Sequence, residues 1–257
     1  METCTEGSNP FLSVITRFSL MKYKVLIFAA TYNEAGNIIN FLDKIFSLKE
    51  ELDILIVDDN SPDLTWSLIE KYKNRNQKKI ELIKRPNKQG LNTAHKLAFT
   101  YAKERKYDIL ITLDADLSHN PLIIPEFLEK LKYNPFVIGS RYIAGGKNEM
   151  RLRRYLLSFI GNKVIKLILN IDIDEFTSSY RGFNLKLLKN FDLNEVSLKG
   201  YSFFMGTINL LHITENNIKQ IPIKFSDRAT GKSKIPKTEI FRTLINLFLI
   251  KFNFIKR

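Results

Sequence analysis

The chain of 257 residues is 44% hydrophobic and 26% charged, an ordinary globular composition that excludes disorder as its main state. Forty Lys and Arg against 27 Asp and Glu give a net charge of +13, which favours a polyanionic partner such as nucleic acid, anionic lipid or a phosphorylated substrate. Residues 141–166 hold seven basic residues and one acid, and residues 217–257 hold ten and two. The positive surplus therefore belongs to two segments.

The single cysteine, Cys4, excludes an intrachain disulfide and favours a reducing compartment. Glu2 and Glu6 stand where a secretory signal would be positively charged, so we expect a protein that is not secreted. No apolar run reaches the roughly 20 residues that a helix needs to cross a bilayer. Because Met21 directly precedes the first strand pattern, we interpret residues 1–21 as a disordered or non-native N-terminal extension.

Short apolar runs alternate with amphipathic stretches in the first half of the chain. In chain order, the pattern predicts strand 24–30, a helix opened at 33–34, strand 53–57, helix 64–73, strand 80–83, helix 92–105, strand 108–113, helix 121–132 and strand 136–139. This alternation predicts an α/β fold, a Rossmann-like, mostly parallel sheet with helices on both faces. Ligands of such sheets bind beyond the carboxyl ends of the strands.

The second half of the chain has a different pattern. Residues 151–169 read as a helix, 218–225 alternate like a strand, and 238–255 place apolar residues among Lys and Arg. Because no Gly/Ser-rich linker divides the chain, we expect one domain over 22–236 and an amphipathic C-terminal helix over 237–257. That helix either lies at a membrane interface or packs onto the domain, and the pattern allows both.

A D-A-D tripeptide, Asp114 to Asp116, follows the predicted strand 108–113. Two carboxylates one residue apart can address a divalent cation that bridges a diphosphate, because hard oxygen ligands suit Mg²⁺ or Mn²⁺. The alternative is a pair of solvated turn acids, since Asp is common after strands.

A second acidic motif, V-D-D-N-S-P-D, covers residues 57–63 at the end of another strand. Ionised carboxylates there can accept hydrogen bonds from ribose hydroxyls or a base edge. The S-P-D end of the motif is equally typical of a helix start. We therefore expect Asp63 to cap the next helix, while Asp58 and Asp59 face the site.

Two further loops follow strands. In T-Y-N-E, residues 31–34, Asn33 is a candidate helix N-cap. In the loop 87–94, Gly90 permits a close backbone approach to a ligand, and Lys88 can reach a phosphate or a base. A P-loop, the G-x-G dinucleotide fingerprint and zinc-ligand spacing are all absent from the sequence.

Eight motifs taken together carry a resemblance to a known family. They are T-Y-N-E (31–34), V-D-D-N-S-P-D (57–63), K-Q-G-L-N-T-A (88–94), L-D-A-D-L-S-H-N-P (113–121), G-S-R-Y (139–142), F-T-S-S-Y-R (176–181), K-G-Y-S-F (199–203) and F-S-D-R-A-T-G-K-S-K (225–234). In this order they resemble family 2 glycosyltransferases of the GT-A fold, and among these the dolichol-phosphate and polyprenol-phosphate mannosyltransferases.

The resemblance implies a site for a nucleotide sugar. The residues that it assigns to donor binding are Ala30, Tyr32, Glu34, Val57, Asp58, Asp59, Lys88, Gly90, Asp114, Ala115, Asp116, Arg141, Arg228 and Lys234. It implies Mg²⁺ or Mn²⁺ at Asp114 and Asp116, with Ser118 as an added ligand. It also implies that the catalytic residues are Asp116, Arg141, Arg228 and Lys234. The three cationic residues among them belong to the two basic segments.

The chain departs from the family pattern at several positions. Ala30 stands where the family usually has Pro, and Asn92 where it has the second Gly of G-L-G. In place of Gln and Glu after K-G-Y, the chain has Phe204 and Gly206. The missing carboxylate at Gly206 affects the acceptor end of the expected site more than the nucleotide end.

The activity that the resemblance implies is inverting transfer of a hexose, in the first place mannose from GDP-mannose, to a polyprenyl or dolichyl phosphate used in protein glycosylation. Such a phosphate is already ionised, so it needs little help from a general base. The implied location is the cytoplasmic side of a membrane, as a peripheral protein in contact with the membrane surface and open to a membrane-protein partner.

Two alternatives follow from the same residues. The runner-up enzyme transfers sugar to a hydroxyl of a glycan or lipid-linked acceptor, although the chain lacks the Glu-Asp pair and the Q-x-x-R-W motif of such enzymes. The alternative of another class is a basic nucleic-acid-binding protein. We expect no nucleic acid partner, because acids at the strand ends would repel a phosphate backbone.

Overall fold

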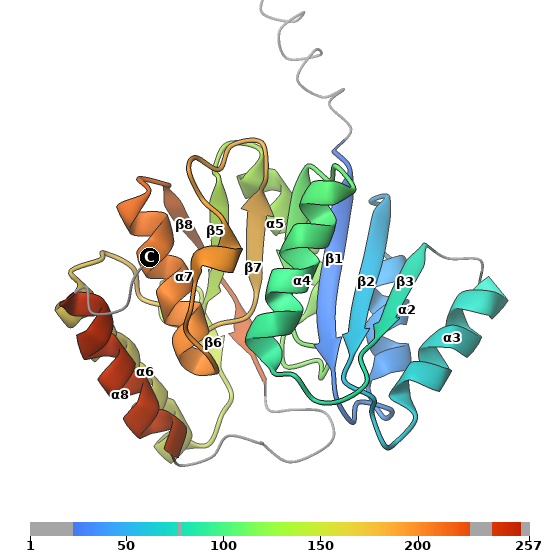
Figure 1. Cartoon of the computed structure of the whole chain (residues 1–257), viewed down its shortest axis with the longest axis horizontal. Helices are drawn as coiled ribbons and strands as arrows, with labels where there is room; N and C mark the ends of the chain where they lie inside the picture. Colours follow the sequence, from blue (N-terminus) through green and yellow to red (C-terminus); the bar gives the residue numbers. More distant parts are fainter. Residues whose placement is uncertain (1–22, 77–78, 227–237, 253–257) are drawn as a thin grey trace, which may run out of the picture.

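The structure is a computed structural model, and it describes residues 23–76, 79–226 and 238–252. A seven-stranded sheet in the order β3-β2-β1-β4-β7-β5-β8 runs through the domain (Figure 1). Its strands are β1 (Val25–Thr31), β2 (Leu52–Asp58), β3 (Ile80–Lys84), β4 (Ile109–Thr112), β5 (Phe136–Ser140), β7 (Arg181–Asn184) and β8 (Ile218–Pro222). The expected extension, residues 1–21, lies outside the described residues.

All neighbouring strands are parallel except around β7, which pairs antiparallel with both β4 and β5. The mostly parallel α/β sheet predicted from the sequence is thus confirmed. Strand β7 was not predicted, because R-G-F-N is short, contains glycine and lacks an apolar run. A second sheet pairs β6 (Lys147–Asn148) with β9 (Lys224–Phe225), where one longer strand over 218–225 was expected.

Helices cover both faces of the sheet (Figure 1). They are α2 (Ile38–Phe46), α3 (Thr65–Asn76), α4 (Leu91–Glu104), α5 (Ile124–Leu131), α6 (Leu152–Leu169), α7 (Tyr201–Ile213) and α8 (Thr238–Lys251), with short 3₁₀ turns η1 (Pro121–Ile123) and η2 (Leu193–Glu195). One buried cluster joins the sheet to α4 and α7, and the other joins it to α2, α3 and α5. Strands β1 and β2 are buried on both faces, which explains their unbroken apolar sequences.

Helix α2 begins four residues later than the sequence pattern indicated. Its N-cap is Asn37, and Asn33 instead has a left-handed backbone with φ of 59°. The candidate N-cap role of Asn33 was therefore wrong. Because residues 32–37 form bends and a turn rather than helix, this segment stays at the carboxyl end of β1.

The last helix, α8, packs against α6 and α7 at one end of the domain (Figure 1). Leu247 and Ile250 of α8 join the buried cluster on the α7 face of the sheet. The predicted C-terminal helix is therefore present from Thr238 to Lys251 and is packed onto the domain. Among the described residues, no helix has both the length and the apolar character that crossing a membrane requires.

Candidate active site

A cavity of about 600 Å³ lies at the carboxyl ends of β1, β4 and β5 and extends along α6 and α8. The predicted site residues that line it are Ala30, Tyr32, Glu34, Asp59, Lys88, Gly90, Asp114, Ala115, Asp116, Ser118 and Arg141. Parallel strands bring these residues together, because their carboxyl ends meet at one edge of the sheet. The register pairs Thr31 of β1 with Asp58 of β2, so the loops after both strands begin at the same level.

The D-A-D motif forms one wall of the cavity. Asp116 is buried, and its Oδ1 accepts hydrogen bonds from the backbone N of Ser118 at 3.0 Å and from its hydroxyl at 2.6 Å. Asp114 is more exposed, and its Oδ2 lies 3.7 Å from Nδ1 of His119. The tight turn through Leu117, with φ of 63°, keeps both carboxylates on the cavity side of β4.

His119 also lines this wall and was assigned no ligand role from the sequence. It is buried against the rings of Tyr180 and Phe225, and its Nε2 has no hydrogen-bond partner. Burial lowers the pKa of His119, and the nearby carboxylates of Asp114 and Asp116 offset only part of that effect.

Asp59 lines the cavity, and it is held by a residue that sequence reasoning missed. Arg85 donates from Nε to Oδ1 of Asp59, from Nη1 to Oγ1 of Thr93 at 2.6 Å and from Nη2 to the carbonyl of Gly90 at 3.2 Å. Arg85 directly follows β3, as the acids follow β2 and β4. That position after a strand was the available signal.

Tyr32 and Lys88 face each other across the same end of the cavity, with Nζ of Lys88 4.5 Å from the centre of the Tyr32 ring. Glu34 is buried beside them, and its Oε2 accepts a hydrogen bond from Nδ2 of Asn37 at 2.8 Å. An aromatic face, a cation and carboxylates thus converge at this end, which suits a nucleoside.

Asp58 does not line the cavity, which corrects the expectation that it faces the site. Its fully buried carboxylate accepts hydrogen bonds from Oγ1 of Thr31 at 2.7 Å and from the N and Oγ of Ser61 at 2.8 and 2.6 Å. Val57 is also fully buried inside β2 and outside the cavity lining. Asp63 does cap α3, because its Oδ1 accepts from the backbone N of Thr65 at 3.1 Å.

Arg141 follows β5 and is bound by a second residue that the sequence did not single out. Its Nε and Nη2 donate to Oε2 and Oε1 of Glu175 at 2.7 and 2.8 Å. Burial opposes ionisation of Glu175, but the Arg141 charge and the hydrogen bonds from Thr177 outweigh it, so the pKa of Glu175 lies below its ordinary value.

Arg228 and Lys234 lie outside the described residues, so their expected contacts stay predictions. The described chain before them ends at Ser226, whose backbone N donates to the carbonyl of Ser118 at 3.2 Å. Ser226, the last described residue before Arg228, is therefore attached to the wall formed by the D-A-D motif.

The remaining part of the cavity is mainly apolar, although Ser158, Asn162 and Thr243 also line it. Its lining there comes mainly from α6 and α8, with Leu157, Ile160, Val164, Ile165, Leu244 and Leu247, and from Phe204 of α7. Arg154 of α6 also lines the cavity. Gly206 does not line the cavity, and a Cβ built on it would lie 2.8 Å from Leu198 and 3.0 Å from Val196.

Comparison with known proteins agrees with this fold. Residues 26–191 match the family described as Glycosyl transferase family 2. An undecaprenyl-phosphate mannosyltransferase of Micrococcus luteus is 30% identical over 225 residues, which cover 87% of this chain and 92% of that one. A polyprenol monophosphomannose synthase of Mycolicibacterium smegmatis is 31% identical over 222 residues, 84% of this chain and 83% of that one.

Among solved structures, a mannosyltransferase from Pyrobaculum calidifontis in complex with GDP-Man and Mn²⁺ matches with a TM-score of 0.55 and 15% identity. The match covers 95% of this chain and 71% of that one. At this low identity, the match supports a similar fold and nothing further. The chain belongs to glycosyltransferase family 2, and its fold is the GT-A fold of these enzymes. The resemblance drawn from the motifs is thereby confirmed.

Proposed function

We propose that the protein transfers mannose, with inversion, from GDP-mannose to a polyprenyl phosphate. The observation that carries this proposal is one cavity with two ends, a charged end at Asp59, Asp116 and Arg141 and an apolar end between α6 and α8. A nucleotide sugar fits the first end and a lipid phosphate the second. The names of both bacterial relatives, a mannosyltransferase and a phosphomannose synthase, support this pairing of substrates.

In the proposed reaction, an oxygen of the lipid phosphate attacks the anomeric carbon of mannose from the face opposite the diphosphate. The bond from that carbon to the diphosphate oxygen breaks, and the electron pair leaves with GDP. The products are GDP and a mannosyl phosphoryl lipid. Because the attacking phosphate is already ionised, the chain's own task is to orient two anions and to stabilise the charge that grows on the leaving group.

The donor set at Asp114, Asp116 and Ser118 fits a hard divalent cation, since all three side chains offer oxygen at one wall. Only two of these three are carboxylates, and in the described part of the chain no group of three or more His, Cys, Asp and Glu side chains could hold a metal ion. We therefore propose that Asp114 and Asp116, with Ser118 as an added ligand, would hold Mg²⁺ or Mn²⁺ together with the donor diphosphate. When bound, the ion would supply positive charge at the leaving group.

Arg141, Arg228 and Lys234 are the proposed cations for the two phosphate groups. Arg141 reaches the cavity from β5, and Arg228 follows Ser226 by two residues in the sequence. Arg154 of α6 is an additional candidate for the acceptor phosphate, because it also lines the cavity. Each of these cations would lower the repulsion between donor and acceptor.

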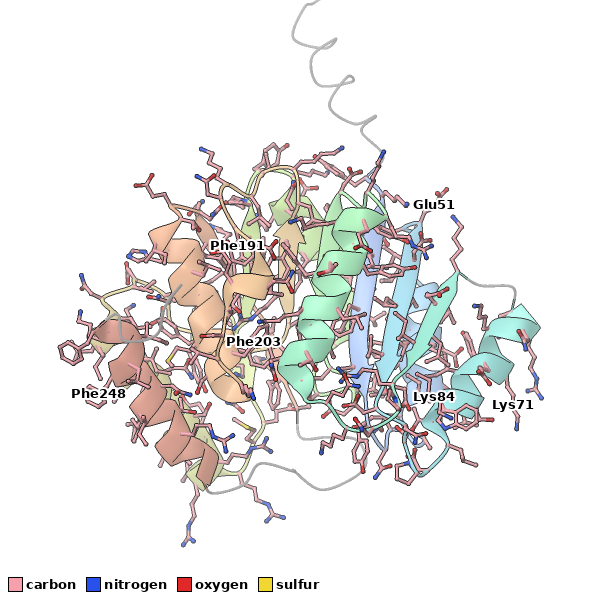
Figure 2. All side chains as sticks on the ribbon, viewed as in Figure 1. Glu51, Lys71, Lys84, Phe191, Phe203 and Phe248 are labelled. Atoms are coloured by element: carbon pink, nitrogen blue, oxygen red, sulfur yellow. The ribbon has the colours of Figure 1, made fainter. Side chains whose placement is uncertain are left out.

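We also propose that α6 and α8 contact a membrane surface. Large apolar side chains are exposed along both helices, among them Leu167 at 82%, Ile245 at 59% and Phe248 at 52%. Figure 2 places Phe248 at the outer side of α8 and Phe203 inside the molecule. Lysines and arginines flank the apolar residues on both helices, which suits an interface with anionic headgroups.

The single cysteine is typical of a reducing compartment and supports the cytoplasmic side of the membrane as the proposed location.

Sedimentation of the full chain with vesicles tests the proposed membrane contact, since we expect the chain to bind anionic vesicles more strongly than neutral ones. Equal recovery in the supernatant with and without vesicles would contradict it.

The activity is tested by incubating the full chain with GDP-mannose or UDP-glucose and with a polyprenyl phosphate, the unphosphorylated polyprenol or a soluble glycan. Each reaction is run with Mn²⁺, with Mg²⁺ and with a chelator, and the product is identified by mass spectrometry. We expect a mannosylated lipid phosphate from GDP-mannose and polyprenyl phosphate, and no product from the polyprenol. Transfer to the glycan instead of the lipid phosphate would establish the hydroxyl-acceptor enzyme.

A further inference from the structure

We propose that Glu175 is a positioning residue, which orients the guanidinium of Arg141 toward the diphosphate of the donor. This inference rests on the proposed function and adds a residue to it. Glu175 lies on the segment between α6 and β7, has no exposed surface and is absent from the cavity lining. Its effect on the reaction must therefore pass through a residue that does line the cavity.

The contact between the two side chains has the geometry that fixes a guanidinium most strongly. The two oxygens of Glu175 accept from Nε and Nη2 of Arg141 at 2.7 and 2.8 Å, so the two planar groups meet along parallel hydrogen bonds. Nη2 of Arg141 also donates to Oγ1 of Thr177 at 3.1 Å. The carboxylate thus sets both the direction and the plane of the guanidinium.

Aromatic rings restrict the same group. Cζ of Arg141 lies 5.1 Å from the centre of the Tyr142 ring and 5.0 Å from that of Phe225. Both distances fall within the range of cation–π attraction. Together with Glu175, these rings leave the guanidinium little freedom to rotate, which reduces the entropy lost when a phosphate binds.

The carboxylate is itself firmly held. Oε1 of Glu175 accepts from the backbone N of Thr177 at 3.1 Å, from its Oγ1 at 2.9 Å and from the backbone N of Ser178 at 3.1 Å. Asn162 of α6 holds the same segment, because its Oδ1 accepts from the backbone N of Phe176 at 2.7 Å. A buried ionised group needs such partners, and here they also make it a rigid support.

The opposite charges of Glu175 and Arg141 explain why Glu175 would act by orienting Arg141. A carboxylate beside Arg141 offsets the positive charge that would attract the diphosphate, so Glu175 weakens the general attraction at long range. What the pair fixes is the direction of the Arg141 N–H groups. A fixed direction favours a transition state, because donors aimed at growing charge need no reorganisation when the bond breaks.

A double-mutant cycle tests this role, and it uses Glu175→Ala, Arg141→Ala and the double variant in the full chain. We expect Arg141→Ala to lower kcat/KM about 100-fold and Glu175→Ala to lower it about 10-fold to 100-fold. The double variant should stay within about 3-fold of Arg141→Ala, because Glu175 acts only through Arg141. A merely structural Glu175 would instead multiply the two losses.

Glu175→Asp keeps the charge with a shorter side chain, and it carries the test if Glu175→Ala does not fold. We expect Glu175→Asp to recover part of the activity and to lower kcat more than it raises KM for GDP-mannose. Asp174→Asn is the matched control, because the neighbouring Asp174 binds Lys163 and Lys166 instead of Arg141. This control should keep kcat/KM within about 2-fold of the wild type.

Two results would overturn the inference: multiplied losses in the double variant, or full kcat/KM in a folded Glu175→Ala or Glu175→Asp protein. Calorimetric binding of GDP-mannose to the same variants separates this inference from the proposed function. If the wild type binds GDP-mannose but transfers nothing to polyprenyl phosphate, the proposed function fails. The double-mutant cycle, measured on the affinity for GDP-mannose, still decides whether Glu175 acts through Arg141.

Discussion

Arg85 binds Asp59 through its Nε inside the wall of the cavity, although the two residues lie 26 positions apart in the chain. Both side chains are almost completely buried, at 5% and 9% exposure. The same guanidinium reaches the carbonyl of Gly90 and the hydroxyl of Thr93. One arginine therefore connects β2, β3 and the start of α4 at the end of the cavity proposed to bind the nucleotide.

Replacing Arg85 by Ala leaves the Asp59 carboxylate buried without its cation. We expect the free energy of unfolding to fall by about 3–5 kcal/mol and KM for the nucleotide sugar to rise. Arg85→Lys should restore only part of both, because lysine cannot make the three directed hydrogen bonds. Urea unfolding and donor saturation kinetics measure the two effects.

The neighbouring Lys84 supplies the control for this experiment. Its Nζ lies 3.5 Å from the centre of the Trp66 ring, and it has no contact with Asp59. Lys84→Ala should therefore cost less than about 1 kcal/mol. A stability loss as large as that of Arg85→Ala would contradict the role assigned to the buried pair.

Asp116 is the proposed metal-binding carboxylate, so Asp116→Ala should lower transfer at saturating Mn²⁺ on the order of 10²-fold or more. A chelator should abolish transfer by the wild type, and added Mn²⁺ or Mg²⁺ should restore it. Glu129→Gln, which alters a surface ion pair with Lys132, should leave the rate unchanged. Full activity of the wild type in the chelator would exclude the metal.

His95 should make the protein less stable in mild acid. It is buried among Phe28, Phe203 and Phe204, and burial, with a smaller contribution from the charge of Arg181, lowers its pKa from 6.5 to about 3. Because the folded-state pKa lies below the unfolded value, the unfolded chain binds more protons between pH 6.5 and 3. Stability therefore falls as the pH falls through this range.

Between pH 7 and pH 5, the contribution of His95 amounts to about 2 kcal/mol. His95→Leu should remove it, so the difference in unfolding free energy between the wild type and this variant should change by that amount. Parallel pH profiles for the two proteins would show that His95 becomes protonated in the folded state.

Gly206 should tolerate a side chain poorly, even though it lies within α7. A Cβ there would lie 2.8 Å from Cδ1 of Leu198, so the strain of about 1–3 kcal/mol exceeds the helix propensity of about 1 kcal/mol that Ala brings. Gly206→Ala should thus lower the Tm. Gly161→Ala in α6 meets nothing within 4 Å and should raise it.

A carboxylate at position 206 should be more harmful than a methyl group. Gly206→Glu directs its side chain toward Val196 and Leu198, and leaving a charge there should cost about 3 kcal/mol or more. The carboxylate typical of the family should therefore lower the stability and the activity of this chain. An active and stable Gly206→Glu protein would contradict this packing argument.

The exposed apolar side chains of α8 should control vesicle binding. Ile245→Glu with Phe248→Glu should weaken binding to anionic vesicles by about 10-fold or more, because each side chain gives up roughly 1.5–3 kcal/mol of burial. Neither residue lines the cavity, so donor binding should persist. Tyr133→Glu, 67% exposed elsewhere on the surface, is the control that should leave vesicle binding unchanged.

The sequence predicted most strands of the sheet and most of the helices that cover it. The strands could be recognised because buried parallel strands appear as continuous apolar runs. It also predicted the edge that carries the site, since acids follow the predicted strands at Asp58, Asp59 and Asp114. Strand β7 escaped prediction, because its pairing with β4 and β5 joins segments far apart in the chain. Local patterns contain no information about such a partner.

Individual roles within the site needed the tertiary structure for the same reason. Asp58 and Asp59 are adjacent and chemically identical, yet one carboxylate is enclosed by Thr31 and Ser61 and the other lines the cavity. The sequence by itself determined that acids and cations gather at the ends of the strands. The tertiary structure decided which of them meet, because hydrogen bonds and burial depend on distances in space.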